Sequence, residues 1–365
     1  MRNKFFILAV FGLVLLSLIN LYTISKISQI QYIKQVFFRQ ALWMIISFIC
    51  MFGASKFPYR KLKLFTVPLF IFVCILLIFV SVFGATRLGA QRWIKLWWLN
   101  FQPSELAKVS VVLLLAHYFS KKNIFYVKQN ANQFGIFKAL ILPFILILIP
   151  VGFILKQPDL GTALVLIFIF ISMLFIVGIN KKFIIFFILA SLLLAPFFWN
   201  SLKPYQKDRI LVFINPNLDP LGAGYTIIQS KIAVGSGRIF GKGLVDATQS
   251  RLRFLPEAHT DFIFASFCEK WGFIGVLILF SLYYLLIYQT LNIAEKTKDM
   301  FGKLLSYGIV LSLGMQIFIN ISMNLGLLPI VGLPLPIMSY GGSSLVITFL
   351  SLGILLNISR TKIVF

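Results

Sequence analysis

The chain has 365 residues, of which 59% are hydrophobic and only 12% are charged, and its mean hydropathy is +0.95. This composition excludes a soluble globular protein, because too few polar residues are available to cover a surface. The net charge of +24 comes from 34 Lys and Arg against 10 Asp and Glu, spread between apolar runs. That spread favours membrane headgroups and control of topology over nucleic acid binding.

Apolar runs of about 20 residues, enough to cross a bilayer, recur along the chain. We predict an all-α polytopic membrane protein, a single integral domain over residues 1–365, with about ten transmembrane helices. The first run shows no cleavage site for a signal peptidase. The predicted spans are residues 5–24, 37–54, 64–84, 104–119, 136–155, 160–179, 182–199, 260–289, 303–325 and 342–358.

The eighth predicted span is longer than a crossing requires and contains Gly272, which predicts a tilt or break there. Three cysteines lie inside apolar segments without the spacing of redox or metal sites, so we interpret them as core residues. They are Cys50, Cys74 and Cys268.

Basic residues gather in alternate loops, and short loops rich in Lys and Arg are retained in the cytoplasm. This pattern predicts that both termini are cytoplasmic and that residues 201–259, a large loop between the seventh and eighth helices, lie outside. Most of the acids fall on that outer side, and ionisable groups near hydrocarbon are costly unless they are paired or functional. We therefore expect any chemistry on the outer face. The acids in this loop and the following helix are Asp208, Asp219, Asp246, Glu257, Asp261 and Glu269.

Residues 102–108 (QPSELAK) predict the start of the fourth helix, with Ser104 as a candidate cap. Glu105 then falls in the first turn, where the helix dipole favours an anion, and Lys108 lies on the same face and can pair with it. The alternative is an ordinary helix start with one snorkelling lysine. Arg92 and Trp93 precede this motif.

Residues 156–162 (KQPDLGT) predict a tight outer turn after the fifth helix. Gln157 and Asp159 are candidate substrate contacts, and Asp159 is equally a candidate N-cap for the sixth helix.

Prolines and glycines between residues 326 and 344 cannot continue a helix, and non-helical backbone at membrane depth requires protein or a wet cavity beside it. We predict a re-entrant loop that lines a cavity before the last helix, with Ser339, Tyr340 and Ser343 as candidate contacts. A plain surface loop is the alternative.

The glycine-rich run 235–243 matches neither nucleotide-binding pattern, so we interpret residues 201–259 as a flexible basic loop. Its cations, including Lys231, are available to an anionic substrate or to lipid headgroups. The loop ends at Asp261, an acid where polar loop meets apolar helix, and Thr260 or Asp261 is a candidate cap of that helix. His259 is either a proton relay or a hydrogen-bonded interfacial histidine.

Three of these motifs together resemble the SEDS family of shape, elongation, division and sporulation proteins: residues 102–108, residues 255–264 (LPEAHTDFIF), and Pro334 to Pro336 with residues 339–344 (SYGGSS). Within the family, residues 219–225, 228–233 and 248–250 resemble the elongation branch (RodA) more than the division branch (FtsW). Ala258 is more typical of the division branch.

The resemblance implies a peptidoglycan glycosyltransferase that polymerises lipid II on the outer face of the cytoplasmic membrane. It implies that Asp261 is the catalytic aspartate, that Trp93 is functionally important, and that Glu105 and Lys108 face a central cavity. The implied partners are a class B penicillin-binding protein, which supplies the transpeptidase, and other membrane proteins of the elongation machinery.

The expected reaction converts an α-linked donor into a β-linked glycan, so a single inverting displacement is enough. It needs a base, for which Asp261 is the candidate, and positive charge at the leaving pyrophosphate. Arg92, Lys108, Lys231 or a divalent cation (Mg or Mn) could supply that charge. A lipid II flippase and an inactive scaffold are the competing hypotheses. The full set of candidate substrate contacts is Arg92, Trp93, Gln102, Glu105, Lys108, Gln157, Asp159, Lys231, Glu257, His259, Ser339, Tyr340 and Ser343.

Overall fold

The structure is a computed structural model that describes residues 4–27, 31–87, 90–96, 99–121, 133–178, 204–220, 222–243, 246–252 and 254–361, together with residues 185 and 189. The chain folds into two compact units, each made of three segments. The first unit is Met1–Gly53, Asp208–Thr290 and Leu313–Gly353, and the second is Ala54–Lys207, Leu291–Ser312 and Ile354–Phe365.

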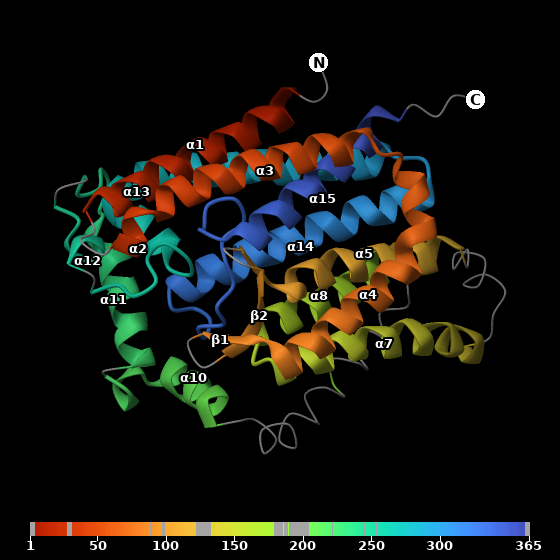
Figure 1. Cartoon of the computed structure of the whole chain (residues 1–365), viewed down its shortest axis with the longest axis horizontal. Helices are drawn as coiled ribbons and strands as arrows, with labels where there is room; N and C mark the ends of the chain where they lie inside the picture. The colour runs from red at the N-terminus through yellow and green to blue at the C-terminus, as the bar shows by residue number, and fades with distance from the viewer. Residues whose placement is uncertain are drawn as a thin grey trace. The chain divides into compact units, whose positions relative to one another are not determined.

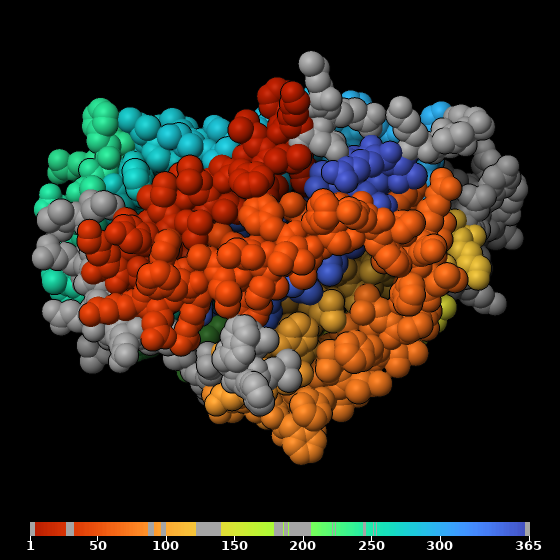
Figure 2. All heavy atoms as spheres, turned by 45° about the horizontal axis from the view of Figure 1, so that its top comes forward, coloured from red at the N-terminus to blue at the C-terminus, as the bar shows by residue number. Residues whose placement is uncertain are grey.

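The first unit is helical and opens with α1 (Lys4–Ile27), α2 (Gln31–Lys34) and α3 (Val36–Lys56) (Figure 1). Helices α1 and α3 lie side by side in both whole-chain views (Figures 1 and 2), and the rings of Phe11 and Phe48 stack between them with centroids 5.1 Å apart. Large apolar side chains stay exposed along both helices, as expected where lipid is the solvent. Examples are Leu8, Leu15, Ile45 and Ile49.

The rest of the first unit comes from the middle and the end of the chain. It contains α10 (Pro204–Ile214), the 3₁₀ turn η2 (Pro216–Leu218), α11 (Ala223–Ser236) and α12 (Thr248–Arg251). Three long helices, α13 (Ile263–Lys296), α14 (Met300–Asn324) and α15 (Gly342–Arg360), each have residues in both units.

The second unit contains η1 (Tyr59–Lys61), α4 (Leu62–Phe83), α5 (Pro103–Lys121), α7 (Gln133–Lys156) and α8 (Leu160–Ile176). Helix α5 packs against α4, α7 and α8, and α4 also contacts α7. Between α4 and α5 lies a small antiparallel sheet of β1 (Ala85–Arg87), β2 (Ala90–Leu96) and β3 (Leu99–Phe101), with Thr86 opposite Gln91 and Lys95 opposite Asn100. The all-α prediction missed this sheet, because two of its strands have only three residues and show no alternation.

The prediction of a polytopic helical membrane protein is confirmed. Six described helices are long and apolar enough to cross a membrane: Lys4–Lys26, Val36–Lys56, Tyr59–Phe83, Ile263–Lys296, Met300–Asn324 and Gly342–Arg360. Residues 140–156 and 160–176 form shorter apolar helices, and α5 covers the predicted fourth span. The predicted seventh span, 182–199, lies outside the described residues apart from 185 and 189, so the count of ten stays a prediction.

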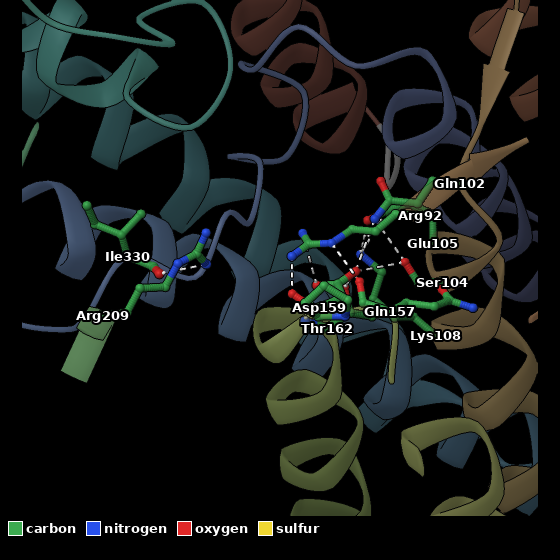
Figure 3. A network of polar contacts seen from close by, with 11 residues as sticks. Arg92, Gln102, Ser104, Glu105, Lys108, Gln157, Asp159, Thr162, Arg209 and Ile330 are labelled. Atoms are coloured by element: carbon green, nitrogen blue, oxygen red, sulfur yellow. Dashed lines mark hydrogen bonds and ion pairs between the residues drawn. The ribbon is translucent and has the colours of Figure 1, made fainter. Parts of the chain in front are cut away.

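The interpretation of residues 201–259 as a flexible loop is wrong for its described part, which contains α10, α11 and α12. The Arg209 guanidinium of α10 donates to the carbonyl of Ile330 at 3.2 Å (Figure 3), and the Ser230 hydroxyl of α11 donates to the carbonyl of Asn324 at 2.7 Å. Buried Ile227 and Ala233 on α11 give the segment its own apolar contacts. These contacts outweigh the glycine content that suggested flexibility.

The predicted break in the eighth helix is confirmed at Gly272 of α13, whose φ is 61° and ψ is −163°. A break leaves main-chain groups of the helix without partners, and these must be satisfied elsewhere. Residues 237–243 satisfy them, so the glycine-rich run supports a helix break. Four main-chain hydrogen bonds join the two: Lys242 N to Glu269 O (2.9 Å), Gly243 N to Lys270 O (3.1 Å), Phe273 N to Arg238 O (2.9 Å) and Ile274 N to Ile239 O (3.2 Å).

Candidate active site

Asp261 lies in a run of turns, residues 256–262, that we name the Asp261 turn; α13 begins directly after it at Ile263. Ala258 and Phe262 are buried in a cluster with Leu255, Ala233 of α11 and Ala265. Asp261 itself is partly exposed. The apolar residues thus anchor the turn on the protein and leave the aspartate at its edge.

Three consecutive carbonyls of the Asp261 turn accept hydrogen bonds from elsewhere in the first unit. The main-chain N–H of Tyr340 donates to His259 O at 2.9 Å, and the Ser339 hydroxyl donates to Thr260 O at 2.6 Å. The side-chain amides of Asn320 and Asn324 both donate to Asp261 O at 3.0 Å. These four hydrogen bonds constrain the backbone of the turn at three successive residues.

The start of α13 is capped by a residue of another helix. Asn324 Oδ1 accepts from the N–H of Ala265 at 3.1 Å, one of the first-turn donors that a local cap would otherwise satisfy. The Thr260 hydroxyl, a predicted cap, instead donates to Glu257 Oε2 at 3.0 Å. The cap oxygen for Ala265 therefore comes from α14.

Residues 333–341, which supply Ser339 and Tyr340, are non-helical, as the proline and glycine pattern predicts. Ile337 has a φ of 68°, a strained conformation for a β-branched residue, which persists only where the surroundings determine it. Leu333, Leu335 and Met338 are buried, so protein packs against this backbone; the cavity beside it stays a prediction. Ser339 Oγ accepts from the N–H of Leu335 at 2.8 Å. Four side chains donate to carbonyls of this segment: Asn320 Nδ2 to Leu333 O (2.7 Å), Tyr283 Oη to Pro336 O (2.6 Å), Ser17 Oγ to Met338 O (2.9 Å) and Gln40 Nε2 to Ser339 O (3.1 Å).

His259 is buried beside Glu257 and Tyr340. Its Nε2 lies 4.0 Å from Glu257 Oε2, and its ring centroid lies 5.8 Å from that of Tyr340. Burial lowers the pKa of His259 below the ordinary 6.5, and the Glu257 carboxylate acts in the opposite direction. The imidazole is therefore neutral at pH 7.

A second group of candidate residues, in the second unit, converges on Asp159 (Figure 3). The predicted N-cap is confirmed, because Asp159 accepts from the N–H of Thr162 at 3.2 Å at the start of α8. Its carboxylate is 1% exposed and accepts further hydrogen bonds from Gln102 Nε2 (3.1 Å) and from the hydroxyls of Ser104 (3.0 Å) and Thr162 (2.9 Å). Ser104 thus lies in the first turn of α5 and binds Asp159.

Arg92 of β2 completes this cluster. Its Nη1 lies 3.8 Å from Asp159 Oδ1, its Nε donates to Gln157 O at 3.1 Å, and its Nη2 donates to the carbonyl of Pro158. The Gln157 side chain is buried and donates to Leu77 O of α4 at 2.8 Å. Arg92, Gln157 and Asp159 therefore join the sheet, α4 and the turn between α7 and α8.

The predicted pair on α5 is confirmed. Lys108 Nζ lies 2.8 Å from Glu105 Oε2, and both residues are 3% exposed or less. An ion pair this deeply buried is stable only while both partners are present, because either charge alone would lack compensation.

The remaining candidates are more scattered. Trp93 is partly buried on β2, Ser343 is buried in the first turn of α15, and Lys231 is exposed on α11. Within the part of the chain that the structure describes, no three His, Cys, Asp or Glu side chains are grouped closely enough to hold a metal ion.

Asn320 and Asn324 are the residues that the sequence reasoning missed. Their four-residue spacing places both amides on one face of a largely apolar helix, in line with Gln316. Buried amides in a membrane helix are costly unless they have partners, so this spacing was the available signal.

Comparisons with known proteins agree with these motifs. The sequence profile of the FtsW, RodA and SpoVE family, described as a cell cycle protein, matches residues 2–363. The peptidoglycan glycosyltransferase MrdB of Escherichia coli (strain K12) is 40% identical over 311 residues, which cover 85% of this chain and 82% of that protein. The probable peptidoglycan glycosyltransferase FtsW of Geobacter sp. (strain M18) is 40% identical over 361 residues, covering 97% and 94%.

Solved structures show the same fold. A chain from a study of the structural coordination of polymerization and crosslinking by a peptidoglycan synthase complex matches with a TM-score of 0.81 and 31% identity, covering 97% of this chain and 96% of that one. The rod shape determining protein RodA of Thermus thermophilus matches with a TM-score of 0.70 and 28% identity, covering 97% and 95%. The chain therefore belongs to the FtsW, RodA and SpoVE family of membrane proteins, the SEDS family that its motifs resemble.

Proposed function

We propose that this chain polymerises lipid II into β-1,4-linked glycan strands at the outer face of the cytoplasmic membrane during cell elongation, with Asp261 as the general base. The observation that carries the proposal is the Asp261 turn, where a partly exposed carboxylate stands on backbone held at three successive carbonyls. The relatives named as peptidoglycan glycosyltransferases support the reaction class.

Asp261 takes the proton of the attacking 4-hydroxyl as that oxygen bonds to the anomeric carbon of the donor. The bond from the anomeric carbon to the pyrophosphate breaks in the same displacement, so the α-linked donor gives a β-linked product and undecaprenyl diphosphate leaves. A base on rigid backbone suits this reaction, since its effectiveness depends on hydrogen-bond geometry to the acceptor.

Lys231 is the cation that we assign to the leaving pyrophosphate. Arg92 is engaged with Asp159 and two carbonyls, and Lys108 is buried against Glu105. Lys231 is exposed, and its neighbour Ser230 is hydrogen-bonded to Asn324, which also holds the Asp261 turn. An exposed ammonium on the helix that carries Ser230 can meet a developing anion.

The test is polymerisation of labelled lipid II by the purified full-length chain, with and without its partner. Asp261→Asn should abolish polymer, whereas Asp246→Asn, a control at an exposed acid of the same segment, should not. Full activity of Asp261→Asn beside an active wild type would show that the base is elsewhere.

Transport of lipid II is the second candidate, favoured by the ionisable residues buried in the helices. Their contacts weaken it: Glu105 is paired with Lys108, and Glu269 accepts hydrogen bonds from residues 249 and 250. In sealed liposomes a flippase would move labelled lipid II across the bilayer without making polymer.

We propose a class B penicillin-binding protein as the partner of this chain. We also propose that both termini of the chain lie in the cytoplasm. The similarity to a chain studied within a peptidoglycan synthase complex supports such a partner. Reporter fusions at the two ends test the topology, and copurification from membranes tests the complex. A periplasmic signal from either end would contradict the orientation.

A further inference from the structure

We propose that Asn320 and Asn324 are positioning residues that aim the carboxylate of Asp261, an inference that rests on its proposed role as base. Both side chains are fully buried, and both amides donate to the Asp261 carbonyl at 3.0 Å. The peptide unit is planar, so two donors on one carbonyl fix the plane that follows Asp261. Holding that plane limits the directions open to the Cα–Cβ bond of Asp261, which carries the carboxylate.

Each asparagine ties Asp261 to a different neighbour. Asn320 also donates to Leu333 O at 2.7 Å, which joins the turn to residues 333–341. Asn324 also accepts from Ala265 N at 3.1 Å and donates to Asn320 O at 2.8 Å, which joins the turn to α13 and α14. The backbone of Asp261 is thus connected through Asn320 to residues 333–341 and through Asn324 to the start of α13.

The hydrogen bonds of Asn320 and Asn324 stabilise the Asp261 turn more than they stabilise α14, the helix that carries the two residues. An apolar side chain would suit a membrane helix as well, and a buried amide is tolerated only where its hydrogen bonds are made. Here most of those hydrogen bonds go to residues 261, 265 and 333. A misplacement of about 1 Å at a reacting group lowers a rate by on the order of 100-fold.

The experiment uses the full-length chain and labelled lipid II, with Asn320→Ala and Asn324→Ala as test variants. Asn357→Ala is the matched control, because Asn357 also donates to a carbonyl (Ser55, 2.8 Å) and accepts from a main-chain N–H (Tyr59, 3.0 Å). Steady-state kinetics are measured on the folded fraction, and thermal unfolding is measured in parallel.

The expected result is a kcat lowered by about 10- to 100-fold in both test variants with KM within about twofold, since a misaligned base affects the transition state and not substrate binding. Asn357→Ala should lose thermal stability and keep its kcat. A kcat within twofold of wild type in folded Asn320→Ala and Asn324→Ala, a raised KM at unchanged kcat, or an equal loss of kcat in Asn357→Ala would each overturn the proposal.

If the alanine variants do not fold, Asn320→Asp and Asn324→Asp take their place. A protonated aspartate can still donate to the Asp261 carbonyl, whereas an ionised one repels it. Their activity relative to wild type should therefore fall as pH rises, and a ratio that stays flat with pH would overturn the proposal. Asp261→Asn is assayed beside them and tests the role of Asp261 separately. If that variant is active, Asp261 is not the base, whatever the activity of the asparagine variants.

Discussion

Glu269, buried in α13, accepts two hydrogen bonds from Ser250, one from its main-chain N–H at 3.0 Å and one from its hydroxyl at 2.7 Å. It also accepts from the N–H of Gln249 at 2.8 Å, so this carboxylate satisfies the start of α12. A buried acid within a predicted span therefore has a structural role.

Glu269→Gln should lower the free energy of unfolding by roughly 1–3 kcal/mol, because the new amide group has one acceptor oxygen fewer and turns a donor toward donors. Thermal unfolding in detergent measures the change. Glu295→Gln, an exposed acid near the end of the same helix, is the control and should unfold like wild type. Equal stability of the two variants would show that Glu269 does not have this structural role.

Lys108→Met should lower the free energy of unfolding by roughly 3–5 kcal/mol, because it leaves the Glu105 carboxylate buried without its partner. The double variant Glu105→Gln with Lys108→Met should recover much of that loss, since neither charge then remains. A double-mutant cycle on chemical or thermal unfolding measures the coupling. Strictly additive losses would show that the pair is not coupled.

Acid should destabilise the protein through His259. Its pKa is lowered by burial in the folded state, so below its ordinary value of 6.5 the unfolded chain binds the proton first. The contribution of His259 to stability is complete above about pH 6.5 and decreases as the pH falls toward the folded value. His259→Asn should make the melting temperature depend less on pH between about pH 7.5 and about pH 5, an interval around the ordinary histidine pKa. An unchanged slope in that variant would assign the acid sensitivity to other groups.

Gly241→Ala should destabilise the break in α13, because a Cβ at this position would lie 2.1 Å from Lys270 O and the φ of 79° is unfavourable for alanine. Gly243→Ala is the matched control, with a φ of 68° and no atom of the described residues within 4 Å of the added Cβ. Its free energy of unfolding should fall by only about 1 kcal/mol, from backbone strain. The difference between the thermal unfolding of the two variants then measures the effect of the steric contact. Similar losses in both would show that residues 237–243 can move away from the helix.

The features that the sequence predicted correctly are local. Asp159 capping Thr162 and Glu105 pairing with Lys108 each depend on two residues three positions apart. Helix geometry fixes such relationships before any tertiary contact forms.

The features that it did not predict join distant residues. Asn320 and Asn324 contact the Asp261 carbonyl across 59 and 63 positions, and Arg209 reaches Ile330 across 121. No periodicity encodes those distances. The same limit explains why the sequence predicts a flexible loop over residues 201–259, since the helices in its described part depend on docking contacts and not on local propensity.

Residues 333–341 have a consequence for genetics. Their shape depends on side chains that are scattered along the chain: Ser17, Gln40, Tyr283 and Asn320. In a saturation screen for loss of cell-wall synthesis, hits at these four positions would look unrelated on a linear map. They would nevertheless report on a single stretch of backbone, and a suppressor of one is expected to arise within residues 333–341.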